Sequence, residues 1–446
     1  MCTLLFICVK IHIVFHDFSY FCVLLKQKNC KKMKRILSMA LLAAFATVAS
    51  AQNPQPLWEV SNTSDVDRTD IPFVMKYEEG LGDIRSAKVM LDNQEIPCQL
   101  DDLNQDGVFD ELCFLLDLKA HQGAALSITF SAEEEQAQYP ARVYAEMLLR
   151  NDKVKEKNKH NNFIESITAR GDCANSYNIQ HHHGVDFESE YNGIRIYFDK
   201  RQTLDLYGKF QKRLELKETQ FYTSKEQKAE GYGDDVLWVG NTFGLGAFRG
   251  WDGQQPTMID PVSSRTQRII SYGPLRTIVE VIDKNWKPYP DKPAITMTIR
   301  YTQYAGSRST DVDVFFDKDV KDYLFSTGII NVKESVEFSD KAGLRGCWGT
   351  DWPSSDHENF KPETVGLGIW IPQQYIRSEE PANKDNYAYV VGTDDRHLSY
   401  KVTYCSDNES FGYHSAEAWF EYLKSWKAKE VDHPGECTPR LKLLSK

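Results

Sequence analysis

The sequence lacks the short motifs that mark several large enzyme classes. It has no GxSxG nucleophile elbow, no HExxH helix, no P-loop and no protein-kinase motif set. The segment GLGAFRG is rich in glycine, but it is not a dinucleotide fingerprint because no GxGxxG lies between a strand and a helix. Serine-hydrolase, zinc-protease and nucleotide-driven functions are therefore unsupported, and we expect no nucleotide cofactor.

Basic residues are too few to balance the acidic ones. The chain has 53 Lys and Arg against 64 Asp and Glu, a net charge of −11. Without residues 1–51 the counts become 46 and 63, because seven basic residues and one acidic residue lie in that segment, and the net charge is −17. A protein this acidic does not hold a nucleic-acid backbone by bulk charge, so we expect no nucleic-acid partner. It can still bind an anionic sugar through a local cluster of Arg and Lys.

CxxC pairs are also absent after residue 51, which disfavours zinc-ribbon and thioredoxin-type sites. The six cysteines in that part of the chain are Cys98, Cys113, Cys173, Cys347, Cys405 and Cys437. An even number allows disulfides in an exported protein, but the spacing selects no pairing. We interpret most of these cysteines as buried apolar side chains.

No apolar run near the N-terminus is long enough for a transmembrane helix, which needs about 20 residues. Instead, Met33 is followed by two basic residues, the apolar run Ile36–Val48 and the residues Ala-Ser-Ala, a pattern typical of a cleaved signal peptide. We expect residues 1–51 to be an upstream extension plus signal peptide, with translation starting at Met33 and the mature protein beginning at about Gln52. The alternative is a membrane anchor built from residues 1–51. A cleaved signal predicts a periplasmic or secreted protein.

Apolar and polar residues alternate along most of the chain, which indicates half-buried β-strands. Segments with this pattern are residues 85–100, 124–132, 193–200, 202–210, 276–283, 293–304 and 309–317. Helical periodicity is scarce until the C-terminus, where Ser415 can cap a helix that places Trp419, Leu423 and Trp426 on one face. We therefore predict an all-β fold, an antiparallel β-sandwich or supersandwich, with a C-terminal α-helix.

A charge run followed by a proline, residues 132–141, interrupts the strand pattern. We place a domain boundary there. Residues 52–135 are expected to form a small Ig-like β-domain, and residues 140–446 a large β-sandwich domain that carries the functional site.

The segment DDLNQDGVFDEL resembles a calcium loop in its spacing. Counted from Asp102, oxygen-bearing side chains fall at the EF-hand positions 1, 3, 5 and 9, with a glycine at position 6. Position 12 is a cysteine where a bidentate Glu belongs, and the flanks look like strands. A polar hairpin turn is the favoured interpretation. The alternative is a structural calcium site whose ligands are Asp102, Asn104, Asp106 and Asp110.

The segment HHHGVDFESE is the most specific signal in the chain. If it is extended, His181 and His183 share one face, and so do Glu188 and Glu190. Two histidines at this spacing near a carboxylate form a known metal-binding arrangement, so His181 and His183 are candidate ligands of a divalent cation. An acid/base role for His183 and a solvated loop without function are the alternatives. The pattern makes no cofactor certain.

The next two strands add a cation and an acid/base trio. Arg195 lies in GIRIYFDK, and Asp205, Tyr207 and Lys209 share one face of the following strand. A phenol or imidazole that moves protons, beside a cation that offsets a carboxylate, suits chemistry on acidic sugars. The alternative is the ordinary polar face of an antiparallel sheet.

Two glycine- and tryptophan-containing segments are candidate sugar-binding loops. Trp238, Arg249 and Trp251 belong to the first, and Trp352 and His357 to the second. Exposed aromatic rings suit the apolar face of a pyranose, and Arg249 suits a carboxylate. Tryptophan in a large sandwich is more often a core residue, so only one or two of these are expected to bind a ligand.

The order of these segments resembles a family of exported domains of unknown function found in polysaccharide-degradation loci of gut and marine bacteria. The resemblance rests on QLDDLNQDGVFDELCF, HHHGVDFESEYNGIRIYFDKR, LDLYGK and DDVLWVGNTFGLGAFRGWDG, and it extends from about Trp58 to the C-terminal helix. It implies a fold similar to mutarotase-like or lyase supersandwich domains, and a link to uronate-containing glycans. It transfers no catalytic residue. Where the family pattern is His-Gly-Pro-Ala-Trp-Glu-Ser-Glu, this chain has Asp186 and Phe187 in the middle of the block.

These observations predict an exported carbohydrate-active enzyme, a lyase or hydrolase acting on oligosaccharides that contain uronic acid. His183 or Tyr207 is the expected base or acid, and Arg195 and Lys209 are expected to neutralise the substrate carboxylate. The glutamates of the histidine segment, Glu188 and Glu190, are expected to orient His183, to bind a cation or to act as the carboxylate pair of a hydrolase. The alternative is a non-catalytic glycan-binding or accessory protein.

Overall fold

The computed structural model describes residues 57–77, 79–171, 179–431 and 442–444, within one compact unit that comprises residues 56–446. The upstream extension and signal peptide predicted for residues 1–51 lie outside the described residues, so the expected export stays a prediction. No helix in the described part of the chain is long and apolar enough to cross a membrane.

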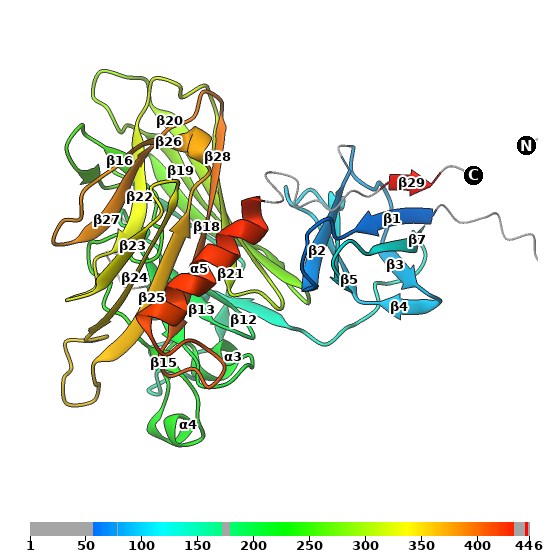
Figure 1. Ribbon diagram of the computed structural model, residues 1–446, viewed down its shortest axis with the longest axis horizontal. Helices are drawn as coiled ribbons and strands as arrows, with labels where there is room; N and C mark the ends of the chain where they lie inside the picture. The colour runs from blue at the N-terminus through cyan, green and yellow to red at the C-terminus, as the bar shows by residue number, and fades with distance from the viewer. Residues whose placement is uncertain (1–56, 78, 172–178, 432–441, 445–446) are drawn as a thin grey trace, which may run out of the picture. The chain divides into compact units, whose positions relative to one another are not determined.

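The first seven strands and β29 form two small antiparallel sheets (Figure 1). These sheets have a hydrophobic core of their own. The sheet orders are β29-β1-β7-β3-β4 and β2-β6-β5. The strands are β1 (Leu57–Ser61), β2 (Arg68–Lys76), β3 (Ser86–Leu91), β4 (Gln94–Ile96), β5 (Cys98–Asp101), β6 (Glu111–Leu118), β7 (Gly123–Ser131) and β29 (Lys442–Leu444). Phe73 and Phe114 stack at 5.4 Å between ring centroids in this core. The division into domains at residues 52–135 and 140–446 stays a prediction.

The remaining strands build a larger, two-layered β-structure whose main element is a nine-stranded antiparallel sheet. Its order is β11-β18-β19-β20-β21-β28-β25-β24-β23. The strands are β11 (Ser166–Arg170), β18 (Ser264–Tyr272), β19 (Arg276–Trp286), β20 (Ile295–Tyr304), β21 (Ser309–Phe316), β28 (His397–Ser406), β25 (Glu363–Trp370), β24 (Leu344–Asp351) and β23 (Val336–Ser339).

Two five-stranded sheets supply the facing layer, with orders β15-β14-β13-β12-β8 and β17-β16-β22-β27-β26. Their strands, and the separate pair β9-β10, are β8 (Val143–Glu146), β9 (Leu148–Leu149), β10 (Asn162–Phe163), β12 (Gly184–Ser189), β13 (Gly193–Tyr197), β14 (Leu204–Gly208), β15 (Asp234–Asp235), β16 (Arg249–Trp251), β17 (Pro256–Thr257), β22 (Phe325–Ile330), β26 (Ile376–Glu379) and β27 (Asn386–Val391). Ile194 and Leu206 from this layer share one buried core with Val279 and Ile299 of the nine-stranded sheet. The predicted all-β sandwich is confirmed.

Helices are few among the described residues, and the longest of them is α5 (Ala416–Val431), which lies across β24 and β25 (Figure 1). The shorter ones are α3 (Leu216–Thr219), α4 (Lys225–Ala229), η1 (His181–His183) and η2 (Gln373–Tyr375). As predicted, the hydroxyl of Ser415 accepts a hydrogen bond at the start of α5, and Trp419, Leu423 and Trp426 are buried. Gly368 lets the helix approach the sheet, because a Cβ there would lie 2.4 Å from Leu423. The helix is a packing element.

The cysteines in the described residues are buried and unpaired, namely Cys98, Cys113, Cys347 and Cys405. Burial raises the pKa of the Cys113 thiol to about 12, so it carries no charge at neutral pH. The interpretation of these cysteines as apolar side chains is confirmed. Cys173 and Cys437 lie outside the described residues.

Gly184, the first residue of β12, lies too close to β13 for any side chain. A Cβ atom on Gly184 would be 1.8 Å from the carbonyl oxygen of Ile196. Gly184→Ala is therefore expected to lower the free energy of unfolding by about 3 kcal/mol, because the two strands must separate to admit the methyl group. Urea denaturation measures this change. Gly123→Ala on β7 is the control, since the nearest atom to a Cβ there is 3.7 Å away, and equal losses in both variants would contradict the close approach.

Candidate functional site

One face of the sheet β15-β14-β13-β12-β8 carries a row of charged side chains. Glu146 on β8 lies opposite Asp186 on β12, and Asp186 lies opposite Arg195 on β13. Arg195 in turn lies opposite Asp205 on β14. None of these four residues, which we call the charged row, is more than 3% exposed. Because side chains alternate along a strand, neighbours such as Ile194 enter the hydrophobic core on the other face, so this sheet is buried on both sides.

Aromatic side chains cover the charged row around Arg195. The guanidinium of Arg195 lies 4.0 Å from the ring centroid of Phe221, 5.1 Å from that of Tyr197 and 6.0 Å from that of Tyr222. The ring of His181 meets Tyr222 edge-on, with centroids 5.5 Å apart. Electrostatic interactions inside such an enclosure are stronger than in water.

The three histidines form the 3-10 turn η1 and not an extended segment. His182 and His183 have φ values of 41° and 70°, in the left-handed region that non-glycine residues seldom occupy. The expectation that His181 and His183 share a strand face is therefore wrong. The ring of His181 stacks on His160 at 3.9 Å, and the buried His182 is the histidine that lies against the charged row. Such local strain persists where surrounding structure holds a functional side chain in place.

A metal ion needs several His, Cys, Asp or Glu side chains whose ligand atoms lie close together. Among the described residues one such group exists, made of Glu146, His182 and Asp186, with ligand atoms within 4.8 Å of one another. Nε2 of His182 is 3.4 Å from Oδ2 of Asp186 and 3.7 Å from Oε1 of Glu146. Burial raises the pKa of Glu146 to about 8 and that of Asp186 well above its usual range. Burial also lowers the pKa of His182 well below its usual range. These three are the residues that can hold a metal ion.

Arg195 joins two carboxylates at the other end of the row. Its Nη2 donates to Asp205 and lies 3.4 Å from Oδ2 of Asp235, which is on β15. The hydroxyl of Tyr197 donates to Asp205 at 3.1 Å. Burial, together with the charge of Asp205, raises the pKa of Asp235 well above its usual range. Asp205 and Asp235, which we call the acid pair, therefore differ in their surroundings, and Asp235 favours its protonated form.

The acid pair approaches the surface at Asp235, whose side chain is 20% exposed. Tyr197 stacks with His183 at 5.9 Å, and the guanidinium of Arg201 lies 4.6 Å from the centre of the Tyr197 ring. Arg201 donates to the carbonyl of Gly240, which lies beside the 57% exposed indole of Trp238. We call the four residues His183, Tyr197, Arg201 and Trp238 the rim.

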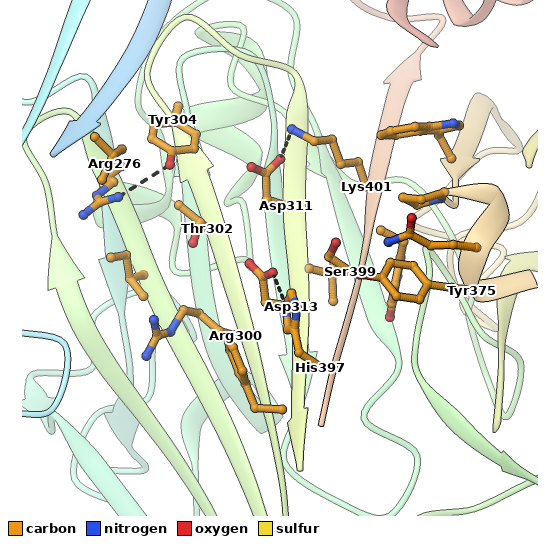
Figure 2. Close-up of a pocket in the computed structure, with 18 of the residues that line it drawn as sticks. Arg276, Arg300, Thr302, Tyr304, Asp311, Asp313, Tyr375, His397, Ser399 and Lys401 are labelled. Atoms are coloured by element: carbon orange, nitrogen blue, oxygen red, sulfur yellow. Dashed lines mark hydrogen bonds and ion pairs between the residues drawn. The ribbon is translucent and has the colours of Figure 1, made fainter. Parts of the chain in front are cut away.

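A cleft lies on the nine-stranded sheet (Figure 2). This cleft of about 1100 Å³ is lined by side chains from β19, β20, β21 and β28 and from η2. Asp311 pairs with Lys401 at 2.9 Å across neighbouring strands. Asp313 pairs with His397 at 2.8 Å in the same way. Cross-strand pairs of this kind are the usual way in which an open sheet face carries charge. The charged row, which leaves buried polar atoms without hydrogen-bond partners, is the stronger candidate.

A family model matches residues 60–436 of the chain, and the family is described as a domain of unknown function, DUF4861. The chain belongs to this family. The resemblance to a family of unknown function is thereby confirmed. The link of DUF4861 to polysaccharide-degradation loci stays a prediction. No curated protein matches the chain.

Solved structures similar to this DUF4861 chain are distant from it. A glycosyl hydrolase family 38 protein from Enterococcus faecalis has a TM-score of 0.43 and 9% identity, over 85% of this chain and 47% of that one. An alpha-mannosidase from Enterococcus faecalis V583 has a TM-score of 0.40 and 10% identity, over 84% and 45%. A putative aldose 1-epimerase from Klebsiella pneumoniae has a TM-score of 0.27 and 10% identity, over 64% and 95%. The chain spans about half the length of the first two proteins, and the comparisons assign it no reaction.

Three residues expected to act on a substrate are fully buried in the DUF4861 chain. Glu188 accepts hydrogen bonds from Lys209 at 2.5 Å and from the amide of Leu216 at 2.8 Å. Lys209 also donates to the carbonyl of Ser189. The hydroxyl of Tyr207 donates to the carbonyl of Gly233 at 2.8 Å. The catalytic and carboxylate-binding roles expected for these residues stay predictions. Their polar groups already form hydrogen bonds within the protein, which favours structural roles.

The other candidates also lie apart from the charged row. Glu190 follows the end of β12 and accepts a hydrogen bond from Arg142 at 2.5 Å. Arg249 and Trp251 are 2% and 7% exposed, and Arg249 donates to Thr203. The prediction that these two side chains form an exposed sugar-binding surface is therefore wrong, because both are core residues. Trp352 stacks on His357 at 3.8 Å in a separate loop, and their predicted sugar-binding role is untested.

The acidic segment after β5 behaves as a turn. Asp102 accepts hydrogen bonds from the amides of Gln105 and Gly107, and Asn104 accepts one from the amide of Asp106. Asp110 accepts one from the amide of Leu103. The oxygens expected to bind calcium are thus used by the backbone, as in an Asx turn. The geometry supports the hairpin interpretation, and a calcium site at Asp102, Asn104, Asp106 and Asp110 stays a prediction without structural support.

Sequence reasoning missed Glu146, His182 and Asp235 as site residues. Glu146 sits in a strand whose alternation looks ordinary, and Asp235 is one of two adjacent aspartates before a tryptophan. Their importance follows only from strand pairing. The strand pattern gave no signal of this, since an antiparallel strand with charge on one face usually turns that face to solvent.

Proposed function

We propose that this protein is a carbohydrate-active enzyme that acts on oligosaccharides containing uronic acid, by a lyase or a hydrolase reaction. The observation that carries the proposal is the acid pair, Asp205 and Asp235, held by the buried Arg195 next to a partly exposed rim. The proposal keeps the expected export of the protein and its link to polysaccharide degradation.

The acid pair has the asymmetry that acid–base catalysis needs. Arg195 and Tyr197 donate hydrogen bonds to Asp205. Burial, together with the charge of Asp205, raises the pKa of Asp235. Two carboxyl groups in different surroundings are the usual acid and base of one reaction. We assign Asp235 as the general acid and Asp205 as the base or nucleophile.

Both reactions can use this pair. A hydrolase needs a protonated carboxyl group that gives its proton to the leaving oxygen. It also needs a carboxylate that either activates a water molecule or attacks the anomeric carbon. A lyase needs a base for the proton at C5 and an acid for the leaving oxygen, with a cation near the substrate carboxylate. We assign this role to Arg201 on the rim, whose side chain is 25% exposed and pairs with Asp199 at 2.6 Å. His183 stays a second candidate for proton transfer.

The reaction is tested with the protein from Gln52 to Lys446 and a panel of pectic, glucuronate-rich and algal oligosaccharides, with products read by mass spectrometry. A product lighter than the hydrolysis product by one water identifies a lyase, and products that have gained water identify a hydrolase. Measurable binding without any product would replace the proposal by the glycan-binding alternative.

Trp238 is expected to form the sugar platform of the rim. Trp238→Ala should weaken oligosaccharide binding by about 1–3 kcal/mol, by analogy with the stacking of bases on aromatic side chains. Isothermal titration calorimetry measures this loss. Tyr272→Ala, which removes another exposed aromatic ring at the end of β18, is the control and should leave affinity unchanged. Unchanged affinity in Trp238→Ala would remove the rim from the binding site.

A further inference from the structure

We propose that Glu146, His182 and Asp186 bind a divalent transition-metal ion such as Zn²⁺ or Mn²⁺. The three side chains come from β8, η1 and β12 and converge beneath the aromatic cover of the charged row. One imidazole nitrogen and two carboxylate oxygens form a donor set suited to these ions. The site is at the opposite end of the row from the acid pair, and the inference stands independently of the proposed reaction.

The spacing of the donor atoms fits a common ion. Nε2 of His182 lies 3.4 Å from Oδ2 of Asp186 and 3.7 Å from Oε1 of Glu146. Two ligand atoms at about 2.1 Å from one tetrahedral ion are about 3.4 Å apart. A direct N–H···O hydrogen bond is shorter, at most about 3.2 Å. The three groups are therefore placed to share an ion and not to bond to one another.

The same atoms are buried without hydrogen-bond partners among the described residues. They are Oε1 of Glu146, both ring nitrogens of His182 and both carboxyl oxygens of Asp186. All three side chains are no more than 2% exposed. Buried polar groups are almost always paired, because the loss of their hydration is costly. A cluster of such atoms from three side chains indicates a ligand that contacts at least one atom of each side chain.

The charge balance of the enclosure also calls for a cation. The charged row and Asp235 contain four carboxyl groups and a single guanidinium, that of Arg195. Lys209, another buried cation that directly follows β14, is bound to Glu188. A buried carboxylate is stable only when it is paired, protonated or bound to a metal. An ion with two positive charges brings the enclosure close to neutrality.

The surroundings hold the ligands in place. The hydroxyl of Tyr144 donates to Oε2 of Glu146 at 2.7 Å, which orients the carboxylate and leaves Oε1 for the ion. Partners of this kind around a metal site fix ligand orientation. The left-handed backbone at His182 places its ring under the cover. Three protein ligands leave at least one coordination position for water or a substrate oxygen, as in catalytic metal sites.

The test measures the metal content of purified protein. The protein is stripped with EDTA, incubated with Zn²⁺ or Mn²⁺ alone, dialysed and analysed by inductively coupled plasma mass spectrometry. We expect about one ion per wild-type chain. His182→Gln and Glu146→Gln should retain less than about a tenth of that, since each removes a direct ligand. His181→Gln and His183→Gln are matched controls from the same turn and should bind as the wild type does.

Two outcomes overturn the proposal. One is a wild-type protein that retains neither ion, and the other is His182→Gln that retains as much as the wild type. Circular dichroism reports whether the variants fold. If His182→Gln does not fold, the deciding measurement is the melting temperature of the wild type, which should rise with the concentration of Zn²⁺ or Mn²⁺ because the ion binds only the folded state. No rise with either ion overturns the proposal.

Discussion

Asp235→Asn is expected to lower kcat on a productive oligosaccharide by about two to four orders of magnitude, the usual contribution of a general acid. Asparagine keeps the size of the side chain and removes the proton that the leaving oxygen needs. Burial and the charge of Asp205 raise the pKa of Asp235, so the wild-type activity should fall as pH rises through that raised value. The variant should lack this limb of the pH profile. Initial rates measured across a pH series check both expectations.

The matched control for this change is Asp252→Asn, an aspartate on an exposed loop whose carboxylate accepts hydrogen bonds only from nearby amides. Its kcat should equal that of the wild type. A loss in Asp235→Asn no larger than that of the control would show that Asp235 is not the acid. If the activity of Asp235→Asn still fell as pH rises, that part of the pH profile would belong to the titration of another group.

Arg195→Leu is expected to reduce the free energy of unfolding by about 3–5 kcal/mol, the cost of leaving a buried charge without its partner. The substitution leaves Asp205 and Asp235 in the enclosure without the guanidinium that both contact. Phe221, whose ring lies over the guanidinium, also loses its partner. Urea denaturation followed by tryptophan fluorescence measures the change.

Arg377→Leu is the control for charge removal. Arg377 pairs with Asp394, whose side chain is 91% exposed. Pairs of this kind contribute about 1 kcal/mol or less. If the two leucine variants lose equal stability, the description of the charged row as a tightly coupled buried cluster is wrong. Arg195→Lys retains the positive charge and should fall between the wild type and Arg195→Leu.

The fold was accessible from the sequence because strand alternation and helix capping are local signals. The polar–apolar alternation of GIRIY and the spacing of Trp419, Leu423 and Trp426 depend only on neighbouring residues. The structure confirms the strand and the buried helix face, although the strand is buried on both of its faces. The turn at His181–His183 was not accessible. Its left-handed backbone at His182 and His183 is held by contacts with distant segments, such as the stacking of His160 on His181.

The site was only partly accessible, because strand location can be read from the sequence whereas strand pairing cannot. Arg195 and Asp205 were placed on adjacent strands, and they do lie opposite each other. Glu146 joins them only because β8 pairs with β12. Arg249 and Trp251 failed as surface candidates for the opposite reason: their local composition suits a binding loop, but β16 lies in the interior of a sheet.

The most direct test is a crystal structure of Asp235→Asn bound to a uronate oligosaccharide that the wild type converts. The account predicts sugar density over the rim, with a ring against Trp238 and the glycosidic bond within hydrogen-bond reach of the side chain at position 235. Density in the cleft of Figure 2, beside Asp311 and Lys401, would contradict it and move the functional site to the nine-stranded sheet.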